Sequence, residues 1–178
     1  LERLYQNVKD KDVGFLLIDA YVKADHFKNA HALLSDLETN FPGAPELLRK
    51  TVDVCYREGD TKKVIESVEK IYEAEKQLDP ALYKILEKTA SAVKHEPRLL
   101  RMLAEEGLRN NKNYLAIKYY KKLALIEPEN NGHLKCLVRL LYEHNLQEAA
   151  MEYCRTLYER RAADEEVLRI SASISESQ

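Results

Sequence analysis

The feature that most constrains this chain is a helical pattern that returns after 34 residues. Small or branched apolar residues mark the repeat, since Ala30 is followed by Val64 and Ala116 by Ala150 at that interval. A fixed period of 20–50 residues is typical of repeat proteins, in which each unit buries its apolar face against the next. The sequence therefore predicts a stack of similar units.

Each unit reads as two helices joined by a short turn. Apolar residues recur at steps of three and four, as on one face of a helix. The first unit ends at Phe41-Pro42-Gly43-Ala44-Pro45, where two prolines prevent the helix from continuing. With only five Gly and five Pro in 178 residues, an all-β fold lacks the turns it needs, so we expect an all-α fold. The predicted units cover residues 11–44, 45–78, 97–130 and 131–164.

The segment between the two pairs of units departs from the period. From Val64 to Ala116 the interval is 52 residues, which exceeds the period by the length of one helix with its loop. Residues 80–95 supply that helix. It either stands as an extra helix between units or pairs with residues 99–109 as a degenerate hairpin. We favour the extra helix, because both flanking units fit the repeat.

The units resemble the tetratricopeptide repeat family, whose pattern is W-x2-L-G-x2-Y, then A-x3-F, then P. No unit has the Trp, and the second unit is degenerate, with Val64 and Val68 in place of Ala and Phe. The resemblance implies a right-handed superhelical stack of antiparallel helix hairpins over roughly residues 11–75 and 97–163. The matching residues are Leu17, Tyr21, Ala30 and Pro42, then Leu103, Ala104, Ala116, Tyr120 and Pro128, then Leu137 and Ala150.

Composition and charge exclude several classes of partner. The net charge of −2 provides no basic field for nucleic acid or an anionic membrane. The longest apolar run, Phe15 to Ile18, is far below the ~20 residues that span a bilayer. We expect residues 1–178 to form one domain in the cytoplasm. Because the chain starts at Leu1 without a Met, we expect it to be a segment of a longer protein.

No pattern of catalytic, metal-binding or phosphate-binding residues is present. Cys55, Cys136 and Cys154 are isolated at apolar helix positions, which favours buried thiols in a reducing compartment over zinc or disulfides. The five His are scattered, and Gly59 and Gly107 are typical of a turn and of a close helix contact. The sequence predicts no enzyme activity, no cofactor and no metal.

Three tyrosines, Tyr114, Tyr119 and Tyr120, could stack on bases, as in proteins that bind single strands. Their helical spacing fits hairpin packing better, so we expect them in the core.

The resemblance also implies a groove, because the first helix of each hairpin lines the concave face in this family. The asparagines of the family's chaperone-tail clamp are replaced by Asp19 and Asp53, so we do not expect that ligand. The charges that remain either solvate the surface or bind an acidic or phosphorylated peptide through guanidinium groups. The candidate groove residues are Arg49, Tyr56, Arg57, Arg98, Arg101, Arg109, Lys135, Arg139 and Tyr142.

The function that this pattern favours is a protein–protein interaction scaffold or adaptor that holds a peptide or a partner helix. RNA binding, as in other helical repeats, is the first alternative, and the net charge argues against it. Self-assembly through exposed end helices is the second, and it would produce a homo-oligomer.

Overall fold

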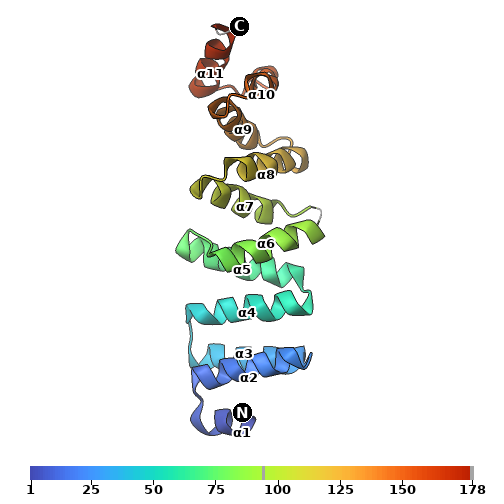
Figure 1. Ribbon diagram of the computed structural model, residues 1–178, viewed down its shortest axis with the longest axis vertical. Coiled ribbons are helices and arrows are strands. Elements are labelled where there is room, and N and C mark those ends of the chain that lie inside the picture. Colours follow the sequence, from blue (N-terminus) through green and yellow to red (C-terminus); the bar gives the residue numbers. More distant parts are fainter. Residues whose placement is uncertain (94, 177–178) are drawn as a thin grey trace. The chain divides into compact units, whose positions relative to one another are not determined.

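The computed structural model describes residues 1–93 and 95–176, and it contains helices and no strands in those ranges (Figure 1). The predicted all-α fold of antiparallel helix hairpins is confirmed. Lys94, which falls in the predicted extra helix, lies outside the described residues. The helices are α1 (Glu2–Val8), α2 (Lys11–Lys23), α3 (Phe27–Asn40), α4 (Pro45–Glu58), α5 (Thr61–Glu75), α6 (Pro80–Ala92), α7 (Pro97–Arg109), α8 (Asn113–Ile126), α9 (Asn131–Glu143), α10 (Gln147–Glu159) and α11 (Glu165–Glu176).

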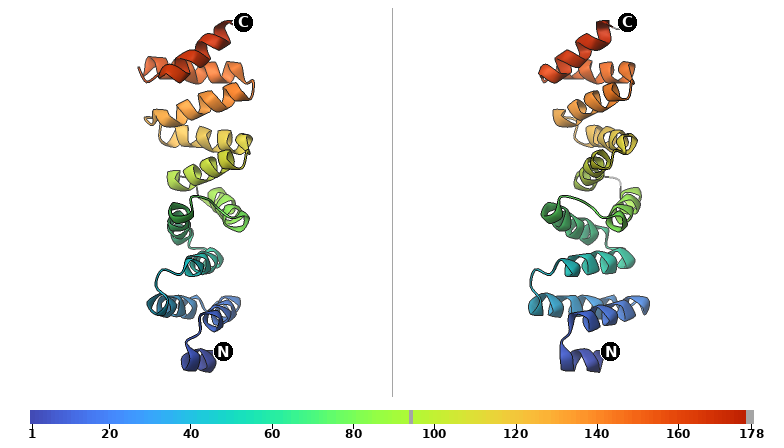
Figure 2. Two further views of the ribbon diagram at one scale, coloured as in Figure 1. Left: turned by 90° about the vertical axis from the view of Figure 1, so that its left-hand side faces the viewer. Right: turned by 60° about the vertical axis from the view of Figure 1, so that its left-hand side comes forward.

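The chain forms two compact units, Leu1–Thr89 and Ala90–Gln178. In the first unit α2 packs on α3, α3 on α4 and α4 on α5. In the second unit α7 packs on α8, α8 on α9, and α9 on both α10 and α11. Within each unit, successive helices are layered in chain order (Figure 2). Each hairpin therefore buries one side in its own pair and another against its neighbour, as expected for a repeat.

Polar side chains at the turns set where several helices begin. The carboxylate of Asp10 accepts hydrogen bonds from the backbone N–H of Asp12 and Val13, both at 3.0 Å, at the start of α2. Asp79 accepts two such bonds at 2.9 Å at the start of α6. Gly59 ends α4 with a φ of 86°, a left-handed conformation that favours glycine. These caps satisfy backbone groups that a helix end leaves without partners.

The small residues of the repeat lie where helices approach most closely. Ala30, Ala116 and Ala150 are completely buried. A Cβ added to Gly107 of α7 would lie 3.1 Å from the backbone nitrogen of Ala116 in α8. Gly107 is therefore the close helix contact that the sequence predicts, and it explains why the facing position is small.

The tyrosine prediction is correct for two residues and wrong for the third. Tyr119 and Tyr120 are buried in α8, but the Tyr114 side chain is 70% exposed. Tyr114 lies in the first turn of α8, on the side of the helix that faces away from α7 and α9. Helical spacing alone did not distinguish this outer side from the buried one.

The described part of the chain contains neither a membrane-spanning helix nor a cluster of metal-binding side chains. No helix there combines the length and the apolar character that crossing a membrane requires. No group of three or more His, Cys, Asp or Glu side chains in those residues could hold a metal ion.

Candidate functional site

The nine predicted groove residues fall into two sets, one in each unit. Arg49, Tyr56 and Arg57 lie on α4 in the first unit. The other six lie in the second unit, on α7 and α9. Both sets belong to the first helices of their hairpins.

In the first unit, Arg49 forms a two-pronged bond within the fold. Its Nη1 and Nη2 each lie 2.7 Å from one oxygen of Glu75, and its Nε lies 3.4 Å from Asp79. The guanidinium lowers the pKa of the Glu75 carboxyl. Because the bond joins α4 to the end of α5 and the start of α6, Arg49 supports the stacking of the helices.

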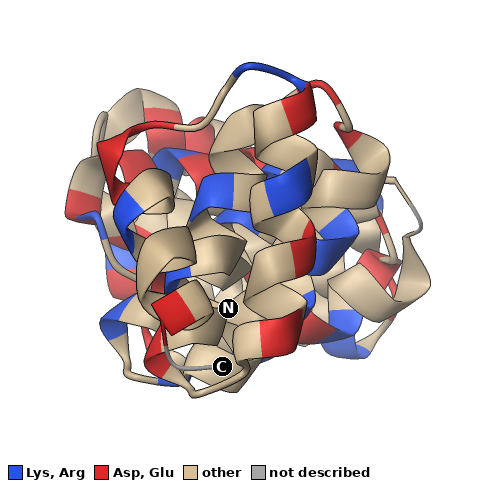
Figure 3. Ribbon diagram, turned by 90° about the horizontal axis from the view of Figure 1, so that it is seen from above, with Lys and Arg blue, Asp and Glu red and all other residues tan. Residues whose placement is uncertain are grey.

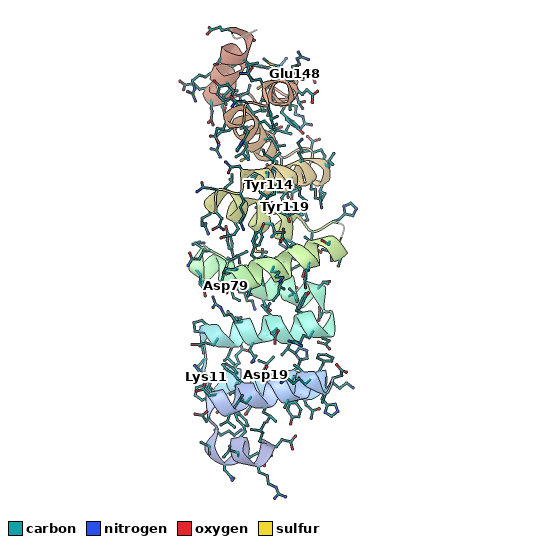
Figure 4. The ribbon with its side chains drawn as sticks, viewed as in Figure 1. Lys11, Asp19, Asp79, Tyr114, Tyr119 and Glu148 are labelled. Atoms are coloured by element: carbon teal, nitrogen blue, oxygen red, sulfur yellow. The ribbon has the colours of Figure 1, made fainter. Side chains whose placement is uncertain are left out.

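The other charges on α4 are also partnered. The Lys50 Nζ lies 2.6 Å from the Asp19 carboxylate of α2, a residue that Figure 4 labels. Arg57 has a longer contact of 3.5 Å with Asp53, one turn away on the same helix, and Tyr56 is half-buried. Helix α4 therefore offers few cations that a partner could engage without breaking contacts within the fold.

In the second unit, Arg109 neutralises a buried carboxylate. Glu106 is 2% exposed, and its oxygens accept bonds from Arg109 at 3.3 Å and from the Asn110 amide at 2.7 Å. A buried carboxylate without such partners would be strongly destabilising. Arg109 thus stabilises the C-terminal end of α7.

Arg101 belongs to a chain of polar contacts that connects α7 to α9. Its Nη2 lies 3.3 Å from Glu127, and the same Glu127 oxygen lies 2.6 Å from the Nε2 of the buried His133. The bond from His133 is the main cause of the lowered pKa of Glu127, and the charge of Arg101 also contributes. The His133 ring packs against Tyr120, with ring centroids 6.1 Å apart.

Lys135 and Tyr142 connect α9 to α11. Lys135 lies 2.7 Å from Asp164, and its hydrogen bond lowers the pKa of that carboxyl. The Tyr142 hydroxyl lies 2.9 Å from the Ser173 hydroxyl. The charged ends of the Lys135 pair and of the Arg101 pair reach solvent, and exposed ion pairs contribute only about 0–1 kcal/mol. An incoming carboxylate could approach Lys135 or Arg101 from solvent, while Glu127 keeps its bond to His133 and Asp164 keeps its bond to the Val167 N–H.

Arg139 is exposed on α9 and has no ion pair within the described ranges. It lies near the phenol of Tyr120, whose pKa is raised by burial first and then by Cys136 and Glu105, while Arg139 lowers it. Tyr120 of α8 therefore has charged neighbours on both α7 and α9. For brevity, the charged residues Arg98, Arg101, Glu105, Lys135 and Arg139 of these two helices are together named the α7–α9 face.

A separate cleft of about 550 Å³ lies between α1, α2 and α3. The Tyr5 hydroxyl donates to Asp36 at 2.7 Å, and Lys9 lies 2.8 Å from the same oxygen. Sequence reasoning missed this network, because Tyr5 and Asp36 are 31 residues apart and belong to different helices. Tyr5 and Lys9, which bond α1 to Asp36 of α3, are among the residues that line this cleft. The cleft therefore belongs to the contact that attaches α1.

Lys and Arg positions are interspersed with Asp and Glu positions along the ribbon (Figure 3). A local patch, and not a general field, must therefore provide any selectivity.

Comparisons with known proteins add little to this picture. No protein-family model matches the chain, and no curated protein matches it significantly. A solved structure described as "Functional Characterization of Pseudomonas Aeruginosa pilF" is 14% identical, with a TM-score of 0.43 over 93% of this chain and 83% of that one. A similarity at this level carries no argument about function. The stacked hairpins themselves are decisive. The chain is a helical-repeat protein.

Proposed function

We propose that the protein is a scaffold of the tetratricopeptide type and that its α7–α9 face binds an acidic segment of a partner protein. The observation that carries the proposal is Arg139, an exposed guanidinium without an ion pair in the described residues, on the helix that also bears Lys135. Arg101 places a second guanidinium on α7, where it contacts Glu127. The proposed role is binding alone, without a chemical step.

The chemistry of guanidinium supports an acidic ligand. A guanidinium presents a planar fork of donors that fits a carboxylate or phosphate with two parallel hydrogen bonds. A carboxylate of the partner could pair with Arg139 and displace Glu127 from Arg101. Glu105, between Arg101 and Arg109 along α7, would repel such a ligand and limit its affinity.

Five of the nine predicted groove residues lie outside the proposed face, namely Arg49, Tyr56, Arg57, Arg109 and Tyr142. Arg49 is engaged by Glu75 and Asp79, and Arg109 by the buried Glu106. Their replacement would weaken the fold and any binding together. Arg57 and Tyr56 remain candidates for a separate contact in the first unit.

The test uses a fluorescein-labelled peptide of ten glutamates and a variant with Arg101→Glu and Arg139→Glu. We expect the variant to bind the peptide at least tenfold more weakly, and about 0.5 M salt to abolish binding by the original chain. The matched control is Lys62→Glu with Lys70→Glu, which makes the same change in charge on exposed positions of α5. Thermal unfolding of both variants confirms that the fold is kept.

Equal loss in the two variants would mean that only net charge matters, and no loss in either would remove the α7–α9 face from consideration. Tighter binding of a poly-uridine strand than of the acidic peptide would favour the RNA alternative.

Self-assembly is a second candidate, favoured by apolar side chains on the two end helices. Leu4 and Val8 of α1 are 49% and 59% exposed, and Leu168 of α11 is 49% exposed. Light scattering over a hundredfold range of concentration tests it. A constant molar mass would exclude association through these helices in that range.

A further inference from the structure

The second helices of the hairpins differ sharply in the side chains that they expose to solvent. In α8 the outward positions follow steps of four, three, one and three, which place them on one side of the helix. We name this row the α8 stripe, and it consists of Tyr114, Lys118, Lys121, Lys122 and Leu125.

The α8 stripe contains no acidic residue, and its two ends are apolar. Tyr114 is 70% exposed and Leu125 is 83% exposed, the two largest exposures among the large hydrophobic residues described. Lys118 lies over the ring of Tyr119, 5.3 Å from its centroid. No carboxylate pairs with Lys121 or Lys122 within the part of the chain that the structure describes.

The same repeat positions on the other second helices are different. In α10, 34 residues further on, Glu148, Glu152 and Glu159 replace Tyr114, Lys118 and Leu125. In α5, Glu66 and Glu73 occupy two of the corresponding positions. The repeat architecture therefore does not require an acid-free row with apolar ends, and this row is particular to α8.

We infer that the α8 stripe is a second docking surface, which binds an acidic amphipathic helix of a partner protein. Tyr114 and Leu125 are eleven residues apart, or about 16 Å along the helix. A partner helix with apolar residues at that separation and carboxylates between them would bury both exposed side chains and neutralise the three lysines. This is the helix-on-helix mode of recognition.

Charge complementarity favours one narrow helix over a broad polyanion. α8 and α10 both pack on α9, and the outward row of α10 has three glutamates against the single Arg155, with Glu148 labelled in Figure 4. A membrane surface or a nucleic acid that covered both rows would meet repulsion from α10. A single partner helix can cover the α8 stripe without covering the row on α10.

This surface goes beyond the proposed function, because it faces away from α7 and α9, the two helices on which α8 packs. A protein that used both surfaces could hold two acidic segments at once, as a scaffold does.

The test uses a synthetic helical peptide with Leu at two positions eleven residues apart and Glu at three positions between them. We expect the full chain to bind it, and Lys118→Glu with Lys121→Glu and Lys122→Glu to weaken binding at least tenfold. The control with Lys28→Glu, Lys62→Glu and Lys70→Glu carries the same charge change on α3 and α5 and should bind as the original chain does. Leu125→Ser should weaken binding several-fold without any change in charge.

A charge-swapped peptide with Lys in place of Glu should bind the triple α8 variant better than it binds the original chain. Because Arg101 and Arg139 stay intact in every variant here, this test can fail while the α7–α9 proposal stands, and the reverse also holds.

Three results would overturn the inference. The first is equal weakening in the α8 variant and its control, or no binding of the peptide at all. The second is stronger retention on vesicles with 30% phosphatidylserine, or on a poly-uridine strand, that depends on the same lysines. The third is self-association of the chain that the triple variant abolishes, which would make α10 of a second copy the occupant.

Discussion

At Ala116 the backbone of α8 approaches the backbone of α7 closely, opposite Gly107. Ala116 is completely buried, and its backbone nitrogen faces Gly107 across the contact between α7 and α8. A Cβ added at Gly107 would already make a tight contact, and Ala116 is completely buried, so a larger side chain at either position must displace its neighbours. The small residue of the repeat pattern thus marks a position where two helices pack closely.

Ala116→Leu should therefore overpack this contact and lower the free energy of unfolding by roughly 1–3 kcal/mol. Urea denaturation followed by circular dichroism measures the loss. Ala172→Leu, at an exposed position of α11, adds the same atoms without crowding and should change stability little. Equal stability of both variants and the original chain would mean that α7 and α8 do not pack as described.

Tyr5 and Asp36 make the attachment of α1 dependent on pH at both ends of the scale. Burial, with a contribution from the bond to Asp36, raises the pKa of Tyr5 to about 12. The bond from Lys9 first, and that from Tyr5 second, lower the pKa of Asp36 below its usual 3.8. A raised pKa of an acid contributes stability that is present below the unfolded value, near 10, and is lost as the pH rises toward the folded value.

Stability should consequently fall between pH 10 and 12, and Tyr5→Phe should flatten that part of the curve. For Asp36 the sign is opposite, because a lowered pKa contributes stability above about pH 4 that is lost as the pH falls through the folded value. Asp36→Asn should flatten the acid side. Denaturation in urea across both ranges provides the measurement, and unchanged slopes in the two variants would contradict the assignment.

At the scale of helices, pairs of charges hold consecutive elements together. Arg49 joins α4 to α5 and α6 through Glu75 and Asp79, and Lys135 joins α9 to Asp164 at the start of α11. A repeat stack has only neighbour contacts, so each such pair acts at one junction.

Arg49→Lys should keep the charge and lose the two-pronged bond. Because the pair is about one-third exposed, we expect a modest loss of roughly 0.5–1 kcal/mol in the free energy of unfolding. A double-mutant cycle with Glu75→Gln isolates the coupling between the two side chains. A coupling energy of zero would show that the bond does not stabilise the junction.

Element by element, the sequence was most informative where geometry is local. Proline and glycine positions, and the small residues at Ala30, Ala116 and Ala150, predict the hairpins because each depends on a few neighbouring residues. Which cations are engaged within the fold depends on partners elsewhere in the chain, as Arg49 depends on Glu75, 26 residues away. Spacing along one helix therefore could not separate Arg49 and Arg109 from Arg139.

Tyr114 also shows that spacing along one helix does not determine which residues are buried. The sequence position of Tyr114 is as compatible with a core residue as that of Tyr119. Only the packing of α8 between α7 and α9 decides which of the two side chains is buried. The α8 stripe became visible once the outward positions of several hairpins could be compared with one another.

At the scale of the molecule, the second unit presents two charged surfaces on different helices. The α7–α9 face belongs to the first helices of its hairpins, and the α8 stripe to a second helix. Repeat proteins expose extended surfaces of this kind, because the core that holds them is formed between neighbouring units.

The most direct test of the account is a titration of the ¹⁵N-labelled chain with the ten-glutamate peptide, followed by NMR. The account predicts that the largest shifts occur in backbone amides of α7 and α9 around Arg101 and Arg139, and that they disappear in the Arg101→Glu, Arg139→Glu variant. Small shifts spread evenly over the lysines and arginines of both units, and kept in that variant, would contradict it.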